Sequence, residues 1–378
     1  MASQCTILNV NDQNVAILES LGCSQTSLTF LGHRRPIKFL HVETSFGLIS
    51  TSQDQTTKLW DLSKGQGQDR KSQQPLVACA ALNPQSILAL SKKGRLMLWR
   101  GSETTYIELL LENVTSMSVA ELEPDSCLVL ITEPRTAYLY MVLTEDFSAH
   151  KLFQADFEPG LGGAVCSCIE TIETRKPGGV SGFIGFDQGA TCALKGILQN
   201  HFTWMGKTEL YSCLDTTLQP AEKTSNLRIT SVHPKLQVSS AFPRNHQANW
   251  TTQSLLIRDN YVIVGTVTGQ VQIKDVESRP LKAFQVHQGA ITGLAAFNND
   301  IFVTSCEDGS LKMWQFLADG NIEQIGEFLG SGSPVTCLSA VNFQGGQAKN
   351  NWGSDVGLVA FGDKAGGLHV LTVKKLER

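Results

Sequence analysis

The sequence lacks long apolar runs, and neither sign of charge dominates it. No stretch of its 378 residues approaches the roughly 18 to 20 apolar residues that cross a bilayer, and its start, MASQCTILNVND, does not resemble a secretory signal. Charged residues make up 17%, with 31 Lys and Arg against 35 Asp and Glu. This near balance argues against a dedicated nucleic-acid surface. We therefore expect neither a membrane nor a nucleic acid as a direct partner.

Paired cysteine motifs are also missing. The ten cysteines include no CxxC pair, so neither a disulfide framework nor a zinc site is indicated. Cysteine that forms no such site behaves as a small buried hydrophobe. The usage therefore favours a reducing compartment, the cytoplasm or the nucleus, and we expect no metal and no cofactor.

The common catalytic motifs are absent too. The sequence contains no G-x-S-x-G, P-loop, dinucleotide fingerprint or H-E-x-x-H pattern. His, Ser and Asp do occur together, but the set recurs with a tryptophan at two places, whereas a catalytic triad occurs once, in one cleft. We therefore expect no catalytic residues and a protein that is not an enzyme.

Short runs rich in Val, Ile, Leu and Thr fill most of the chain, and no apolar period of helix length is sustained. The runs come in pairs around a polar turn, which is typical of antiparallel strands. The first runs of four pairs are 86–90, 127–131, 261–264 and 301–303, and the second runs are 95–99, 137–140, 270–273 and 310–314. The pattern predicts an all-β protein.

Two His/Asp/Trp trios share one spacing. In each trio the aspartate precedes the tryptophan by six residues and the histidine precedes it by 27, and the trios lie 254 residues apart. The trios are His33, Asp54 and Trp60, and His287, Asp308 and Trp314. Identical spacing at such a distance predicts an internal repeat.

The position held by Trp60 can be followed along the chain by its distance from the preceding turn. The intervals between successive positions are 39, 41, 54, 80, 40 and 57 residues, and several lie near the roughly 40–45 residue period of four-stranded propeller blades. The positions are Trp60, Trp99, Tyr140, Leu194, Lys274, Trp314 and Leu371. They predict seven blades, and the interval of 80 leaves room for an eighth.

These repeats resemble the WD40-repeat β-propeller family, in which a Gly-His pair opens the repeat and a Trp-Asp pair closes its third strand. Residues 32–62 and 287–316 carry the resemblance most clearly. The resemblance implies a buried hydrogen-bond chain in each of two blades, with Val286 and Gln315 departing from the family pattern. The chain residues would be His33, Ser50, Asp54 and Trp60, and His287, Thr304, Asp308 and Trp314.

The family also suggests how the ring is closed. A strand at 27–30 lies just before the first repeat and should complete the last blade, beside 367–371. Closure removes the sheet edges that invite aggregation. We accordingly expect an N-terminal segment at 1–26 and one propeller over 27–378, with a long insertion or a degenerate blade at about 197–251, and little chain outside the propeller.

Binding is expected in loops, because loops on a rigid scaffold commonly carry function. Residues that flank the buried chains are the candidates for contact with partner proteins: Arg34, Arg35, Gln53, Gln288 and Glu307. The aromatic residues of the insert are a second set, either interface anchors or the core of a degenerate blade. They are Phe202, Trp204, Tyr211, Phe242 and Trp250.

The sequence is compatible with three functions. The first is a non-enzymatic scaffold for protein–protein interaction within a multi-subunit assembly. The second is a ligand-sensing regulatory propeller from the C-terminal part of an apoptosome-type signalling ATPase. The third is a propeller enzyme with a site in the central channel.

Overall fold

The structure is a computed structural model of the 378-residue chain, which falls into two compact units. The first unit comprises residues 1–84 and 286–378, and the second comprises 85–285. The residues that the structure describes are 5–10, 13–20, 23–43, 47–61, 66–72, 74–83, 86–123, 125–157, 162–172, 179–187, 191–200, 211–214, 227–229, 237–241, 252–258, 261–275, 280–297, 301–317, 321–328, 332–342 and 356–375.

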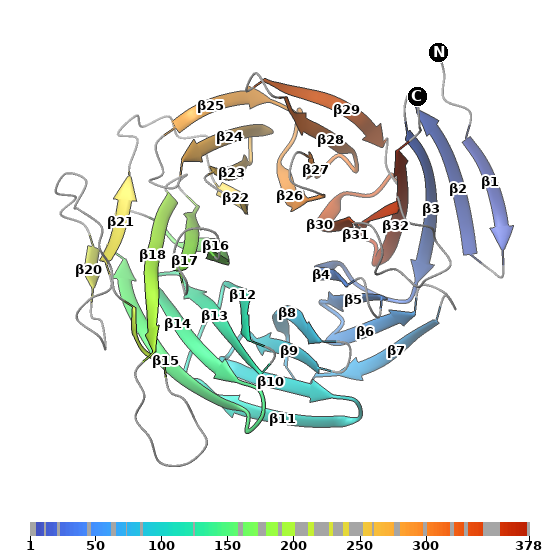
Figure 1. Cartoon of the computed structure of the whole chain (residues 1–378). Coiled ribbons are helices and arrows are strands. Elements are labelled where there is room, and N and C mark those ends of the chain that lie inside the picture. The colour runs from blue at the N-terminus through green and yellow to red at the C-terminus, as the bar shows by residue number, and fades with distance from the viewer. Residues whose placement is uncertain are drawn as a thin grey trace. The chain divides into compact units, whose positions relative to one another are not determined.

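Among its described residues, the first unit contains three antiparallel sheets (Figure 1). The first has the order β4-β5-β6-β7, the second β26-β27-β28-β29, and the third β1-β2-β3-β32-β31-β30. Strand β8 (Leu76–Asn83) lies against β4 and β5. The other strands are β1 (Cys5–Val10), β2 (Gln13–Ser20), β3 (Cys23–Leu31), β4 (Ile37–Glu43), β5 (Gly47–Ser52), β6 (Thr56–Asp61), β7 (Gln66–Lys71), β26 (Ile291–Ala296), β27 (Ile301–Cys306), β28 (Leu311–Phe316), β29 (Ile322–Phe328), β30 (Val335–Asn342), β31 (Val356–Asp363) and β32 (Gly367–Lys375).

The six-stranded sheet joins the two ends of the described chain. Strand β3 pairs antiparallel with β32, and the register places Ser27 opposite Leu371 and Phe30 opposite Leu368. This is the pairing expected for the strand at 27–30. The sequence did not predict β1 and β2, which extend the sheet beyond β3 as successive antiparallel neighbours (Figure 1).

The second unit contains four antiparallel sheets among its described residues. Their main orders are β9-β10-β11, β12-β13-β14-β15, β16-β17-β18 and β22-β23-β24-β25. The strands are β9 (Ser86–Ser91), β10 (Arg95–Arg100), β11 (Glu103–Glu108), β12 (Ser116–Glu123), β13 (Ser126–Glu133), β14 (Thr136–Leu143), β15 (Ser148–Phe157), β16 (Ala164–Ile172), β17 (Gly179–Phe186), β18 (Thr191–Asn200), β22 (Thr252–Arg258), β23 (Tyr261–Thr266), β24 (Gln270–Asp275) and β25 (Pro280–Gln285).

The long insert adds strands to neighbouring sheets. β19 (Tyr211–Leu214) and β21 (Gln237–Ala241) both pair with β18, and β20 (Leu227–Ile229) pairs with β15. The candidate anchors Phe202, Trp204, Phe242 and Trp250 lie outside the described residues, and the structure describes only the backbone of Tyr211.

The prediction of an all-β protein with four-stranded antiparallel sheets is confirmed, and the described residues contain no helix. The four predicted pairs of runs lie in β9–β10, β13–β14, β23–β24 and β27–β28, each paired antiparallel. Neighbouring sheets in a unit pack through apolar side chains, because inner strands such as β9 and β13 are buried along almost their whole length. In the second unit, the rings of Phe157 and Phe186 pack edge to face, with a distance of 4.9 Å between the ring centroids.

Candidate functional site

A hydrogen-bond chain crosses the β4–β7 sheet from its tryptophan to its turn. Trp60 Nε1 donates to Ser50 Oγ at 2.7 Å, and Ser50 Oγ lies 2.7 Å from His33 Nε2. His33 Nδ1 lies 3.2 Å from Asp54 Oδ2. An indole N–H can only donate, so the Ser50 hydroxyl accepts from Trp60 and donates to Nε2, and His33 faces Asp54 with its Nδ1 proton. The structure thus brings together the four side chains that the family resemblance names.

Asp54 terminates this chain and fixes the loop around it. Its carboxylate accepts the backbone N–H of Arg34 at 2.9 Å, and both the N–H and the hydroxyl of Thr56, at 2.9 and 2.6 Å. Burial by itself raises the pKa of Asp54, but these hydrogen bonds outweigh it and lower the pKa from 3.8 to about 2. Burial lowers the pKa of His33, against the opposing effect of Asp54, so the imidazole is neutral at pH 7.

A glycine lets the histidine segment approach the tryptophan. A Cβ added to Gly32 would lie 2.6 Å from Trp60 Cη2, which is closer than side chains tolerate. The Gly-His pair therefore has a steric reason here: a side chain before His33 would push the indole away from Ser50.

A second chain crosses the β26–β29 sheet. Trp314 Nε1 donates to Thr304 Oγ1 at 3.1 Å, and Thr304 Oγ1 lies 2.8 Å from His287 Nε2. The connection to the aspartate runs through Ser310, whose Oγ lies 3.1 Å from His287 Nδ1 and donates to Asp308 Oδ1 at 2.6 Å. Here too the four predicted side chains lie together, with a serine between His287 and Asp308 that the sequence analysis did not include.

The pKa of His287, the histidine of the second hydrogen-bond chain, is strongly lowered. Burial and the positive charge of Lys312 lower the pKa of His287 from 6.5 to about 4. Burial by itself raises the pKa of Asp308, but hydrogen bonds from Ser310 and the Cys306 thiol lower it overall. At pH 7 this hydrogen-bond chain therefore contains a neutral His287 imidazole and an ionised Asp308 carboxylate.

The predicted partner-binding residues lie in the loops that these chains anchor. Arg34, Arg35, Gln53, Gln288 and Glu307 are all exposed. The backbone around them is fixed: Ser52 Oγ donates to the Arg35 carbonyl at 2.8 Å, Gln53 N donates to the Pro36 carbonyl at 3.0 Å, and the Glu307 carboxylate accepts the N–H of Ala290 at 3.0 Å. Side chains on such loops are presented to solvent from a rigid support.

A third buried pair of aspartate and histidine, which sequence reasoning missed, lies in the β30–β32 sheet. His369 Nε2 lies 3.0 Å from Asp363 Oδ2, and the imidazole stacks on Phe361 at a centroid distance of 4.6 Å. Asp363 lies eight residues before Leu371, as Ser52 lies eight before Trp60. The pair could have been found by aligning the repeats on that interval.

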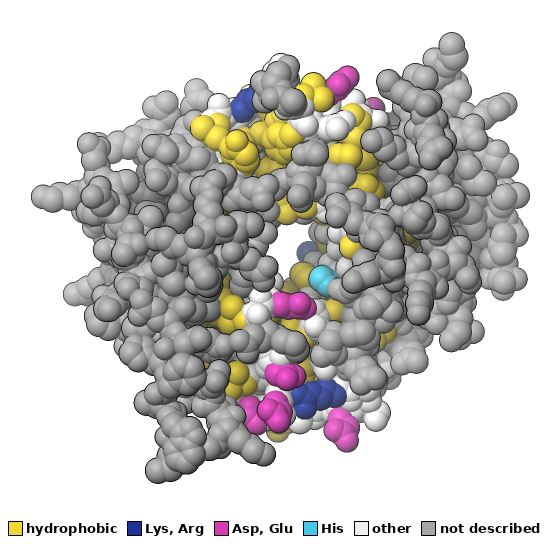
Figure 2. Space-filling view, in the orientation of Figure 1, with side chains coloured by type: hydrophobic (Ala, Val, Ile, Leu, Met, Phe, Trp, Pro, Cys, Tyr) yellow, Lys and Arg dark blue, Asp and Glu magenta, His cyan; other side chains and the backbone are white. Residues whose placement is uncertain are grey.

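The second unit exposes apolar side chains that sequence reasoning also missed. Leu110 is 93% exposed and has a φ of 55°, a left-handed conformation that is uncommon for leucine. Tyr106, 60% exposed, lies under the Arg95 guanidinium at 4.8 Å, and Arg95 also pairs with Glu108 at 2.6 Å. Figure 2 shows acidic and basic side chains gathered over β10 and β11 at the lower edge of the view.

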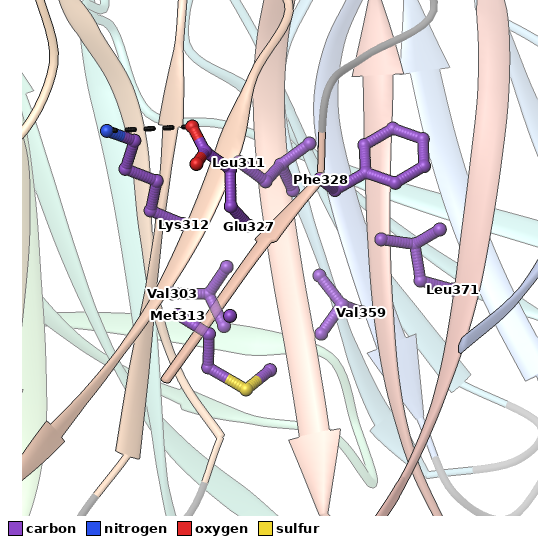
Figure 3. Close-up of a pocket in the computed structure, with 9 residues that line it drawn as sticks. Val303, Leu311, Lys312, Met313, Glu327, Phe328, Val359 and Leu371 are labelled. Atoms are coloured by element: carbon purple, nitrogen blue, oxygen red, sulfur yellow. Dashed lines mark ion pairs between the residues drawn. The ribbon is translucent and has the colours of Figure 1, made fainter. Parts of the chain in front are cut away.

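A small pocket lies between the β26–β29 sheet and β31–β32 of the first unit (Figure 3). Its walls are mostly apolar and include Phe328, Val359 and Leu371, and the ion pair between Lys312 and Glu327, at 3.6 Å, lies along one side. Leu371 occupies the position that tryptophan holds in the β4–β7 and β26–β29 sheets. A smaller side chain at that position accounts for a packing gap better than a ligand site does.

Comparison with family models identifies the repeat that contains the second chain. Residues 278–315 match the WD domain, G-beta repeat. The chain therefore contains a segment that matches a WD40 repeat. The match ends one residue beyond Trp314, and the remaining sheets agree with the all-β architecture of WD40 repeats. A WD40 repeat points in general to a role as a protein-interaction scaffold.

The solved structures similar to this chain include a crystal structure of the computationally designed Ika8 protein. The TM-score is 0.52 at 18% identity, and the alignment covers 92% of this chain and 98% of that one. Identity that low supports a shared fold alone. No curated protein matches the chain. Within the described ranges, no helix of membrane-spanning length and hydrophobicity occurs.

Proposed function

We propose that the chain is a seven-bladed β-propeller, closed by β3 against β32, that serves without enzymatic activity as a protein–protein interaction scaffold in a multi-subunit assembly. The three sheets of the first unit and the four of the second, counted over the described residues, support seven blades. The propeller would cover 27–378, after the segment 1–26. The described cysteines are free thiols, which supports a reducing compartment such as the cytoplasm or nucleus.

One observation carries the scaffold proposal. Two buried hydrogen-bond chains hold loops whose outward side chains are charged or polar, while the described residues bring no comparable set of groups into a pocket. Arg34 shows the design: its backbone N–H is bound by Asp54 and its side chain is exposed. Exposed charges that are held in place steer encounter and set specificity between proteins.

Charge reversal tests the scaffold proposal. The double variant Arg34→Glu, Arg35→Glu and the single variant Glu307→Lys should each lose at least one partner in a pulldown from lysate, with a loss of about 1–2 kcal/mol per interface contact. Their unfolding temperatures should barely move, because isolated surface changes alter stability by roughly 0.5 kcal/mol or less.

The matched control is Glu103→Lys, an exposed charge on β11 that flanks neither chain. It should leave the partners that depend on Arg34 and Glu307 unchanged. A screen for turnover of small metabolites runs beside the pulldown. Unchanged partners in both loop variants, together with reproducible turnover, would defeat the scaffold proposal in favour of an enzyme.

A further inference from the structure

Exposed basic side chains gather where two turns of the first unit meet. Arg34 and Arg35 lie in the loop before β4, and Lys364 lies in the turn between β31 and β32; all three are exposed. A Cβ added to Gly366 of that turn would lie 2.6 Å from the His33 carbonyl oxygen and 3.0 Å from that of Arg35. The two turns therefore touch backbone to backbone, and this contact brings the three cations close together.

The two turns carry no exposed acidic residue beside these cations, which we call the basic surface. Over residues 32–38 and 362–368 the acidic residue is Asp363, which is buried and bonded to His369. The carboxylate of Asp54, which also reaches the loop, is largely buried and bonded to its backbone. Within the described part of the chain, none of the three cationic side chains forms an ion pair.

A carboxylate inside each turn fixes the backbone from which the cations project. Asp54 accepts the backbone N–H of Arg34 at 2.9 Å, and Asp363 accepts the backbone N–H of Gly367 at 2.8 Å. The side chains of Arg34 and Lys364 thus point from supported turns into solvent. Because the backbone is ordered before binding, a partner that meets this surface loses little affinity to the ordering of loops.

An acidic turn bounds the basic surface on one side. The backbone N–H of Lys364 donates to the Pro334 carbonyl at 2.9 Å, and a Cβ added to Gly309 would lie 3.0 Å from the neighbouring Ser333 carbonyl oxygen. The next turn along the unit is therefore the one between β27 and β28, which carries the exposed Glu307. Positive charge is thus confined to a short stretch of surface.

We propose that Arg34, Arg35 and Lys364 form a docking surface for a short acidic segment of a partner protein. An arginine guanidinium binds a carboxylate through two parallel hydrogen bonds, so the two arginines suit Asp and Glu side chains. A nucleic acid fits less well, because DNA-binding proteins commonly neutralise about 6–10 phosphates and this chain has a net charge of −4. The inference rests on the proposed scaffold function and adds the chemical class of the partner.

The test uses the full chain and a defined probe, a fluorescein-labelled peptide in which aspartate alternates with glycine. The same peptide with asparagine in place of aspartate is the control probe. Fluorescence anisotropy should show that the aspartate peptide binds, that its affinity falls as salt is added, and that the asparagine peptide does not bind. Lys364→Glu should weaken binding of the aspartate peptide by about 10-fold or more, because it places a like charge beside the carboxylates.

The matched control is Lys92→Glu, which reverses an exposed lysine in the turn between β9 and β10 of the second unit. It should bind the aspartate peptide as wild type does. Absence of binding by wild type, or equal weakening in Lys364→Glu and Lys92→Glu, would overturn the proposal. Should Lys364→Glu lower the unfolding temperature, Lys364→Gln replaces it, and an unchanged affinity there would equally refute the surface.

An RNA oligonucleotide of the same length is the third probe. RNA that binds more tightly than the aspartate peptide, and whose binding is lost in Lys364→Glu, would assign the surface to nucleic acid and contradict the proposal.

The peptide assay and the pulldown can fail separately. If the aspartate peptide does not bind while the double variant of Arg34 and Arg35 still loses partners, the docking inference is wrong and the scaffold proposal stands. If peptide binding depends on Lys364 while charge reversal changes no partner, the docking surface is supported and the scaffold proposal is contradicted.

Discussion

Ser52 and Cys306 occupy the same position in two different sheets, eight residues before Trp60 and Trp314 respectively. The Ser52 hydroxyl donates to the Arg35 carbonyl and accepts the Asp54 N–H, at 2.8 and 3.1 Å. The Cys306 sulfur instead receives backbone N–H groups and lies beside a carboxylate. The β4–β7 and β26–β29 sheets can therefore be compared directly. The equivalent loop contacts the Ser52 oxygen in the first sheet and the Cys306 sulfur in the second.

Removing Asp54 should destabilise the first unit. Asp54→Ala leaves the N–H groups of Arg34 and Thr56 and the His33 ring without their acceptor, and we expect a loss of roughly 2–4 kcal/mol in the free energy of unfolding. Asp69→Ala is the control, because Asp69 is half exposed and its ion pair with Lys58 should contribute only about 0–1 kcal/mol. Thermal unfolding measures both. Unchanged unfolding with weaker partner binding would mean that Asp54 is a surface contact.

Stability should fall on mild acidification. The pKa of His287 is lowered from 6.5 to about 4 in the folded chain, so between these values the unfolded chain binds the extra proton. The contribution of neutral His287 to the free energy of unfolding is therefore complete above pH 6.5. It is lost as the pH falls toward 4, and the loss is about 1–3 kcal/mol. Urea unfolding from pH 7 to 4.5 measures the slope. His287→Gln should flatten it, and equal slopes in both proteins would contradict the assignment.

Lys274, a buried lysine of the second unit, should make the stability of the protein depend on pH in the alkaline range. Lys274 is 2% exposed, its Nζ donates to Thr191 Oγ1 at 2.9 Å, and burial lowers its pKa from 10.5 to about 8. Between pH 8 and 10.5 the unfolded chain holds the proton, so wild-type stability should rise with pH.

Replacing Lys274 should remove the increase of stability with pH and also the free-energy cost of burying a charged ammonium group. Lys274→Met should stabilise the protein at pH 7 by about 1–3 kcal/mol, as happens when buried charges give way to apolar residues. The exposed Lys92→Met is the control and should change little. Chemical denaturation at pH 7 and pH 10 tests this, and a destabilised Lys274→Met at pH 7 would show that the charge is better solvated than its burial implies.

Removing β3 should open the six-stranded sheet. Deletion of residues 1–31 exposes the edge of β32 along its whole pairing with β3, and we expect aggregation or proteolytic sensitivity. Deletion of residues 1–20 removes β1 and β2 but keeps β3, and should be tolerated better. Size-exclusion chromatography and limited proteolysis compare the two. A monomeric, equally stable chain after the longer deletion would refute a structural role for β3.

The spacing of the two His/Asp/Trp trios predicts the repeat, and the family resemblance then implies the two hydrogen-bond chains. A four-stranded unit with a fixed turn leaves one distance between His33 and Trp60, and that distance recurs at His287 and Trp314. Strand β3 was predictable for a similar reason, since it precedes the first repeat where an outer strand belongs. β1 and β2 have no counterpart in the repeat, so periodicity contained no information about them.

What the sequence could not predict depends on side chains that meet across a turn. Asp363 and His369 are six residues apart on opposite strands, and only the turn makes them neighbours. From the sequence, Cys306 is expected to be one more buried hydrophobe, because it belongs to no CxxC pair. Its nearness to Asp308 emerges only when the second strand and the turn are folded together.

The pairing of β3 with β32 also sets a timetable for protein synthesis. Ser27 leaves the ribosome well before its partner Leu371, which lies 344 residues later in the sequence. At roughly 5–20 residues per second, the early strand waits on the order of half a minute for its neighbour. During that interval the edge of β3 that later pairs with β32 has no partner, and an unpaired strand edge of this kind can pair with other chains.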